Sequence, residues 1–148
     1  SSPSGASPSR RARRARADRL QMAFDTTARI LVVDDYQSMV DLIHDMLRQL
    51  GYRDIERAMD AATALRKFRE KPCDLVISDW YMEPMTGLDL LRHVRKTWQN
   101  MPFIMLTGRA TEDFVLAAKE HGVNGYVVKP VSFDGLKQRV EKILGPLT

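Results

Sequence analysis

The feature that most constrains the fold of this 148-residue chain is a regular alternation of short apolar runs with amphipathic segments. The apolar runs lie at residues 30–33, 54–59, 74–78, 102–106 and 125–128. After each run, apolar side chains return at the three- and four-residue spacing that is typical of a buried helix face. The runs themselves are too short for helices, so we interpret them as strands. Strands that alternate with helices predict an α/β fold with a parallel sheet.

Short connections between these segments limit the topologies that the chain can adopt. Parallel strands joined by helices need right-handed crossovers, and the helices cover both faces of the sheet. We therefore predict a flavodoxin-like (βα)5 fold, doubly wound, around a five-stranded parallel sheet of order 2-1-3-4-5. Capping residues predict the helix ends: Asp60, Thr111 and Ser132 begin helices, and Gly51 and Gly122 end them.

Helical spacing also predicts which side chains face the core. In the helix expected over residues 87–98, these are Leu88, Leu91 and Val94. In the last helix, Phe133 begins the inward-facing series.

The positive charge of the chain is concentrated near its N-terminal end. The chain has 23 basic and 19 acidic residues, but six arginines and only one acid lie within residues 1–22. This segment is also rich in Ser, Pro and Ala and has little to bury, so we expect residues 1–27 to be a disordered extension. We expect residues 28–147 to form one nearly neutral domain.

Three interpretations of the extension stay open. It is a basic arm for nucleic acid or another acidic surface, an organellar transit peptide, or a solvated extension upstream of a true start at Met22. No apolar run reaches the roughly 20 residues that a membrane span needs. The single cysteine, Cys73, has no internal disulfide partner. Both observations fit a cytoplasmic protein in a reducing compartment.

Polar side chains stand at the ends of four predicted strands. Asp34 and Asp35 follow the first strand, Asp79 the third, Thr107 the fourth and Lys129 the fifth. Strands one and three are neighbours about 4.8 Å apart in the predicted order, so the three carboxylates should converge where such sheets bind ligands. Taken singly, Asp35 also fits a helix cap, Asp79 a turn-capping acid and Lys129 a surface lysine.

These side chains together have the components for transferring a phosphoryl group to a carboxylate. Two unit charges about 4 Å apart repel by about 4 kcal/mol at an effective dielectric of about 20, so the acidic cluster needs a cation. A few hard oxygen ligands suit Mg²⁺, which keeps several waters and binds a substrate phosphate. Lys129 would neutralise a phosphoryl oxygen and Thr107 would donate a hydrogen bond, with a carboxylate as nucleophile.

Other ligand-binding classes fit this sequence poorly. A flavin-binding protein of this fold would carry a Ser/Thr/Gly phosphate loop where the chain has Asp34 and Asp35, which would repel an uncoordinated phosphate. A dehydrogenase would need a G-x-G-x-x-G motif there, and this motif is absent. An aspartyl-phosphate hydrolase of the haloacid dehalogenase type would place D-x-D on the first strand, which DDYQS does not match, and the chain leaves no room for its cap domain.

The motifs ILVVDD, DLVISDWYMEPMTGLDLLRHVR, FIMLTG and GYVVKP resemble, in order and spacing, the receiver domains of two-component response regulators. The resemblance covers about residues 28–147 and is strongest to stand-alone, CheY-like members. It implies that Asp79 is the phospho-acceptor. It also implies that Mg²⁺ is held by Asp34, Asp35, Asp79 and the backbone carbonyl of Tyr81.

The resemblance further implies a switch. Thr107 would turn towards the phosphoryl group, Lys129 would pair with it, and Tyr126 would move from outside to inside. The bond before Pro130 would be cis, which is rare enough among X-Pro bonds to be a sharp test. The surface made by the fourth helix, fifth strand and fifth helix would then change, and output would come from binding another protein.

Two features depart from the usual pattern of the family. Glu83 stands where a proline is common, and Pro84 follows one place later. Tyr81 and Arg109 occupy positions that tune dephosphorylation in the family, and we expect them to shield the acyl phosphate from water.

The partners implied are a histidine kinase and a downstream effector protein, which includes a motor switch or a histidine phosphotransfer protein. The chain would be a cytoplasmic monomer without a DNA-binding domain or membrane span. It would act as a signalling switch that catalyses its own phosphorylation and slow dephosphorylation, and not as a conventional enzyme. A phosphorelay intermediate, a phosphate sink and a receiver-like binding module independent of phosphorylation stay open as alternatives.

Overall fold

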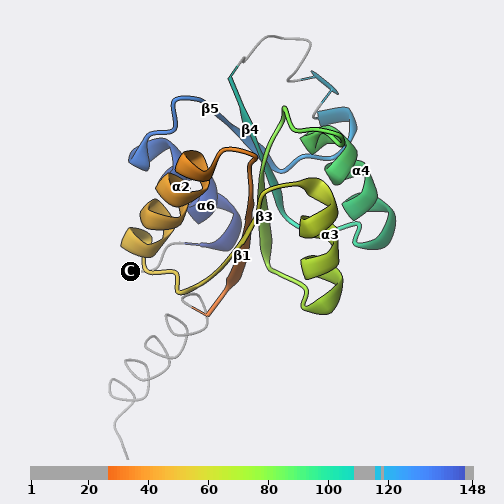
Figure 1. Ribbon diagram of the computed structural model, residues 1–148. Coiled ribbons are helices and arrows are strands. Elements are labelled where there is room, and N and C mark those ends of the chain that lie inside the picture. The colour runs from red at the N-terminus through yellow and green to blue at the C-terminus, as the bar shows by residue number, and fades with distance from the viewer. Residues whose placement is uncertain (1–26, 109–115, 118, 146–148) are drawn as a thin grey trace, which may run out of the picture.

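The structure is a computed structural model that describes residues 27–108, 116–117 and 119–145. Its centre is a parallel sheet of order β2-β1-β3-β4-β5 (Figure 1). This order confirms the predicted topology. The strands are β1 (Arg29–Val33), β2 (Asp54–Ala58), β3 (Leu75–Asp79), β4 (Phe103–Thr107) and β5 (Gly125–Val128).

Helices cover both faces of the sheet, as the doubly wound fold requires. In Figure 1, α2 and α6 lie on one side of the sheet and α3 and α4 on the other. Residues 116–117 and 119–120 are also helical, whereas the predicted start of that helix at Thr111 lies outside the described residues. The other helices are α2 (Gln37–Leu50), α3 (Ala61–Glu70), α4 (Gly87–Thr97) and α6 (Phe133–Leu144).

Alternate residues of the strands supply the two halves of the core. Leu31 and Val33 of β1 pack in the cluster beneath α3 and α4, while Ile30 and Val32 pack in the cluster beneath α2 and α6. β3 and β4 are buried along their whole length, because both of their faces are covered. This explains why the central strands appear in the sequence as continuous apolar runs and the edge strand β2 as a more polar one.

Capping residues fix the helix ends much as predicted. The Asp60 side chain accepts a hydrogen bond from the Thr63 backbone N–H at 2.7 Å, and the Ser132 hydroxyl oxygen accepts one from the Gly135 N–H at 3.0 Å. Gly51 ends α2 with φ 109°, a left-handed conformation that favours glycine.

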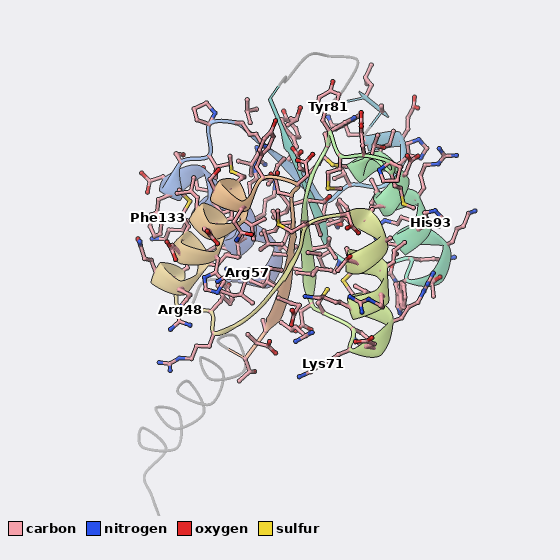
Figure 2. The ribbon with its side chains drawn as sticks, in the orientation of Figure 1. Arg48, Arg57, Lys71, Tyr81, His93 and Phe133 are labelled. Atoms are coloured by element: carbon pink, nitrogen blue, oxygen red, sulfur yellow. The ribbon has the colours of Figure 1, made fainter. Side chains whose placement is uncertain are left out.

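Some details of the helix faces differ from the prediction. Leu90 is buried beside Leu91 and Val94, whereas Leu88 is only partly buried. Phe133 is likewise half-buried, and Figure 2 shows it at the periphery of the molecule. Among the described residues, no helix combines the length and apolar character needed to cross a bilayer.

Candidate functional site

The register of the sheet brings the predicted acidic residues together. β1 pairs with β3 so that Val33 lies opposite Ser78. The next residue is an aspartate in both strands: Asp34 directly follows β1, and Asp79 is the last residue of β3. Asp34, Asp35 and Asp79 each offer a carboxylate oxygen, and these three atoms lie within 4.8 Å of one another. The predicted convergence of three carboxylates at the carboxyl edge of the sheet is therefore confirmed.

The three carboxylates differ in their exposure to water. Asp34 is fully buried and Asp79 is 3% exposed, whereas Asp35 is exposed. Burial raises the pKa of both Asp34 and Asp79 because the charged carboxylate loses water. A hydrogen bond of 3.0 Å from the Tyr36 backbone N–H to Asp34 Oδ1 partly offsets this effect.

Lys129 supplies a positive charge between the two buried carboxylates. Its Nζ lies 2.8 Å from Asp79 Oδ1 and 3.2 Å from Asp34 Oδ2. Burial lowers the pKa of Lys129, but the hydrogen bond to Asp79 and the charges of both carboxylates outweigh that effect and raise it. The ammonium is therefore held in its charged form, in contact with the site and not on the surface.

The backbone around Lys129 ties this residue to the end of β4. Its N–H donates to the Thr107 carbonyl at 2.7 Å, and the Lys129–Pro130 bond is cis, as predicted. Thr107 is the last residue of β4 and is 2% exposed. The bond between Glu83 and Pro84 is also cis, which the sequence did not predict.

The other predicted site residues lie at different depths. Tyr81 is 50% exposed on the loop after β3. Tyr126 is half-buried on β5, where it packs against the cluster beneath α3 and α4, and the Arg139 guanidinium lies 5.5 Å from the centre of its ring. Arg109 lies outside the described residues.

A cavity of about 690 Å³ opens over the acidic cluster. Its volume falls in the range that small-molecule sites usually have. The lining includes Asp35, Tyr36, Asp79, Tyr81 and Lys129. Asp79 is thus reachable from the solvent side although little of its surface is exposed.

Sequence reasoning placed Gly87 between a turn and a helix but missed that the geometry of the site requires glycine at this position. A Cβ on this residue would clash with the Asp79 carbonyl oxygen, and the Gly87 N–H donates to the Trp80 carbonyl at 2.8 Å. Only glycine lets α4 begin this close to the end of β3. The signal in the sequence was the Thr86-Gly87 pair between the loop and the amphipathic run.

The residues present fit a divalent metal ion. Three carboxylates share one described ammonium group, and repulsion between Asp34 and Asp79 adds to the rise in the Asp34 pKa. Oxygen donors of this kind are the ligands that Mg²⁺ prefers, with its remaining positions left for water or a phosphate. A bound dication would relieve the repulsion that the single lysine leaves.

Comparison with known proteins gives a consistent result. Residues 30–141 match the model of the response regulator receiver domain. The chain is 42% identical over 117 residues to chemotaxis protein CheY of Pseudomonas aeruginosa, covering 78% of this chain and 94% of that protein. It is 34% identical over 126 residues to CheY-3 of Vibrio cholerae, covering 84% and 97%. The solved structure of V. cholerae CheY4 is similar with a TM-score of 0.75 at 30% identity, covering 79% and 98%.

Proposed function

This chain belongs to the response regulator receiver domain family of signalling switches, and we propose that it accepts a phosphoryl group on Asp79 from a histidine kinase. The observation that carries this proposal is the position of Lys129. Its ammonium group lies within 3.2 Å of two buried carboxylates, and one of these, Asp79, lines an open cavity together with Lys129. An ion pair that served only to stabilise the fold would need a single acid beside the lysine and no cavity over it.

We assign the metal ligands to Asp34, Asp35 and Asp79, with the backbone carbonyl of Tyr81 as a fourth. Mg²⁺ bound there would neutralise phosphoryl oxygens during transfer. Asp34, which is buried and held by the Tyr36 N–H, fixes the position of the cluster. Asp35 is exposed and completes the cluster on the side that lines the cavity.

The transfer itself requires little covalent chemistry from the protein. An oxygen of Asp79 attacks the phosphorus atom, the new P–O bond forms, and the P–N bond to the donor histidine breaks with its electron pair going to the nitrogen. Lys129 stays beside the acceptor and pairs with an oxygen of the incoming group. Positioning and charge neutralisation thus account for the rate.

The added charge would then drive a shift between two packings. Thr107 turns towards the phosphoryl group, and Tyr126 moves inward into the space that the threonine leaves. The half-buried position of Tyr126 supports this, because the ring lies between the fully buried and the fully exposed positions and can move to either. The proposed output surface comprises β5, α6 and the predicted helix before β5, of which residues 111–115 and 118 lie outside the described residues.

The partner at this surface is a protein, and relatives named as chemotaxis proteins favour an effector of the motor-switch type. A phosphorelay intermediate and a phosphate sink use the same chemistry at Asp79 and differ only in where the phosphoryl group goes next. We expect the chain to work as a cytoplasmic monomer.

Intact mass after incubation with acetyl phosphate tests the acceptor and the metal together. We expect one added phosphoryl group with Mg²⁺, none without Mg²⁺, and none for Asp79→Asn. Asp45→Asn is the matched control, because Asp45 is exposed on α2 and is not part of the cavity lining. No gain in any condition would reject phosphorylation and leave a receiver-like binding module.

Tyr81 at the mouth of the cavity is expected to slow hydrolysis of the acyl phosphate. Its half-exposed ring can cover the phosphoryl group and exclude water, so Tyr81→Asn should shorten the phosphoryl half-life severalfold. Decay of the phosphorylated mass after removal of acetyl phosphate measures it. The same half-life in both proteins would show that the ring does not shield the group. The corresponding role of Arg109 stays a prediction.

A further inference from the structure

Two tyrosines stand at the entrance of the cavity that contains Asp79. Tyr36 is 67% exposed and Tyr81 is 50% exposed, and both line this cavity. Figure 2 shows Tyr81 at the end of the molecule where the strands of the sheet end. We propose that these two rings form an aromatic rim that selects phosphodonors whose leaving group is a planar ring. This proposal rests on the proposed phosphorylation of Asp79.

Local structure accounts for the exposure of both rings. Tyr36 precedes α2, and its backbone N–H donates to Asp34 Oδ1, so the chain is held at the site while the side chain projects into solvent. Tyr81 lies between Trp80 and Met82, which are 7% and 3% exposed. Because its two neighbours turn into the core, Tyr81 points out over the cavity.

Exposed aromatic rings offer a surface that a ligand can cover. Aromatic pairs in offset or edge-to-face arrangements are worth more than their buried area alone, and a cationic ring gains further from a tyrosine face. An imidazole that carries a phosphoryl group is planar and becomes cationic when its second nitrogen is protonated. It can therefore contact a tyrosine face while its phosphorus atom reaches Asp79.

The step that the rim would assist is balanced without any further reactant. The P–N bond of the phosphoimidazole breaks and a P–O bond to Asp79 forms. The electron pair of the broken bond stays on the ring nitrogen, and a ring protonated on its other nitrogen leaves as neutral imidazole. With phosphoramidate the same bonds change, but the leaving group is ammonia, which has no ring to contact Tyr36 or Tyr81.

This pair of donors isolates the contribution of the ring. The quantity to measure is the ratio of the phosphorylation rate with phosphoimidazole to that with phosphoramidate, both with Mg²⁺, followed by intact mass. In Tyr36→Leu/Tyr81→Leu, which keeps apolar bulk but loses the rings, we expect the ratio to fall by about two- to tenfold. Tyr36→Phe/Tyr81→Phe keeps the rings and should keep the ratio. Leu42→Ala is a control for an exposed apolar residue that is not part of the cavity lining.

A second measurement needs neither phosphoryl transfer nor a metal ion. Free imidazole added to the metal-free chain should show saturation transfer from tyrosine ring protons to its own, and the Leu double variant should abolish this signal. Both substitutions replace exposed side chains, so the fold should be kept; the circular dichroism spectrum checks this.

The outcomes separate the two proposals. If both donors phosphorylate every variant and the ratio stays the same, the aromatic rim is rejected while phosphorylation of Asp79 stands. An equal fall of the ratio in the Phe and Leu variants would also reject it, since the ring would not be the cause. If neither donor adds mass to the parent chain, the proposed function fails and the rim fails with it.

Discussion

Two ion pairs in this protein have the same length, but the pKa values of the acids in them are shifted in opposite directions. Lys129 Nζ lies 2.8 Å from Asp79 Oδ1 at the carboxyl edge of the sheet, and Lys67 Nζ lies 2.8 Å from Glu56 Oε1 at the β2 edge. The pKa of Asp79 is raised, chiefly by burial, whereas the hydrogen bond from Lys67 lowers the pKa of Glu56. The distance between the charged atoms alone therefore does not determine the direction in which the pKa of the acid is shifted.

The difference lies in burial and in the number of charges of each sign. Glu56 is about one-third exposed and also pairs with Arg29 at 3.4 Å, and Arg29 in turn pairs with Asp54 at 3.0 Å, so two cations serve two acids. At the carboxyl edge, one lysine serves two acids that have lost their water, with Asp35 close by. A cluster that keeps excess negative charge in a buried place is ready to bind a cation, which a balanced surface pair is not.

The largest difference between the two lysines should appear in phosphorylation. Lys129→Met removes the charge beside Asp79 and should slow phosphoryl gain from acetyl phosphate by on the order of 100-fold. Lys67→Met should leave that rate unchanged and alter the free energy of unfolding by about 1 kcal/mol or less, as for other exposed pairs. Intact-mass time courses and urea unfolding measure the two effects. Equal phosphorylation rates in the two variants would remove the distinction between the pairs.

The second-largest difference between the carboxyl edge of the sheet and the β2 edge should appear in how much Mg²⁺ stabilises the fold. Mg²⁺ at a hundred times its dissociation constant should raise the free energy of unfolding by about 2.7 kcal/mol, because only the folded chain assembles the acidic cluster. Asp35→Asn should lose most of this gain, whereas Glu56→Gln should keep it. Urea unfolding with MgCl₂ and with EDTA checks this. Retention of the full gain by Asp35→Asn would place the metal elsewhere.

The same contrast explains what the sequence could and could not predict. Asp34, Asp79, Thr107 and Lys129 were predictable because each stands directly at the end of an apolar run, and parallel strands bring such ends together. The alternation of strands and helices therefore indicated a fold class with a known strand order, and the residues at the strand ends indicated the composition of the cluster.

Features that depend on the path of a loop were not predictable in this way. The need for Gly87 arises from the approach of α4 to the Asp79 carbonyl, and the exposure of Tyr36 and Tyr81 arises from neighbours that turn inward. No periodic pattern encodes these contacts. The ion pairs of β2 were also missed, since their partners come from β1 and α3 and meet only after folding.

The smallest effect, and the one that tests the comparison most directly, is the pH dependence of stability without metal. A carboxyl whose folded pKa is raised, such as Asp79, holds its proton in the folded state at a pH where the unfolded state has lost it. Its contribution to stability therefore falls as the pH rises from the unfolded pKa to the folded one. Glu56, whose folded pKa is lowered, contributes stability above its unfolded pKa that is lost as the pH falls through the folded pKa.

Substitution of Asp79 and substitution of Glu56 should thus change the slope of the unfolding free energy against pH in opposite directions. In EDTA, Asp79→Asn removes a contribution that declines as the pH rises from the unfolded pKa of Asp79 towards its raised folded pKa, so the unfolding free energy should rise more steeply there than in the parent chain. Glu56→Gln removes a contribution that grows with pH only below the unfolded pKa of Glu56, so its profile should be flatter on that more acidic side. Lys129, whose raised pKa lies in the alkaline range, should affect neither range of pH. If both substitutions flattened the profile, the Asp79–Lys129 pair would be an ordinary stabilising pair, and the buried cluster would carry no excess of negative charge for a metal ion to neutralise.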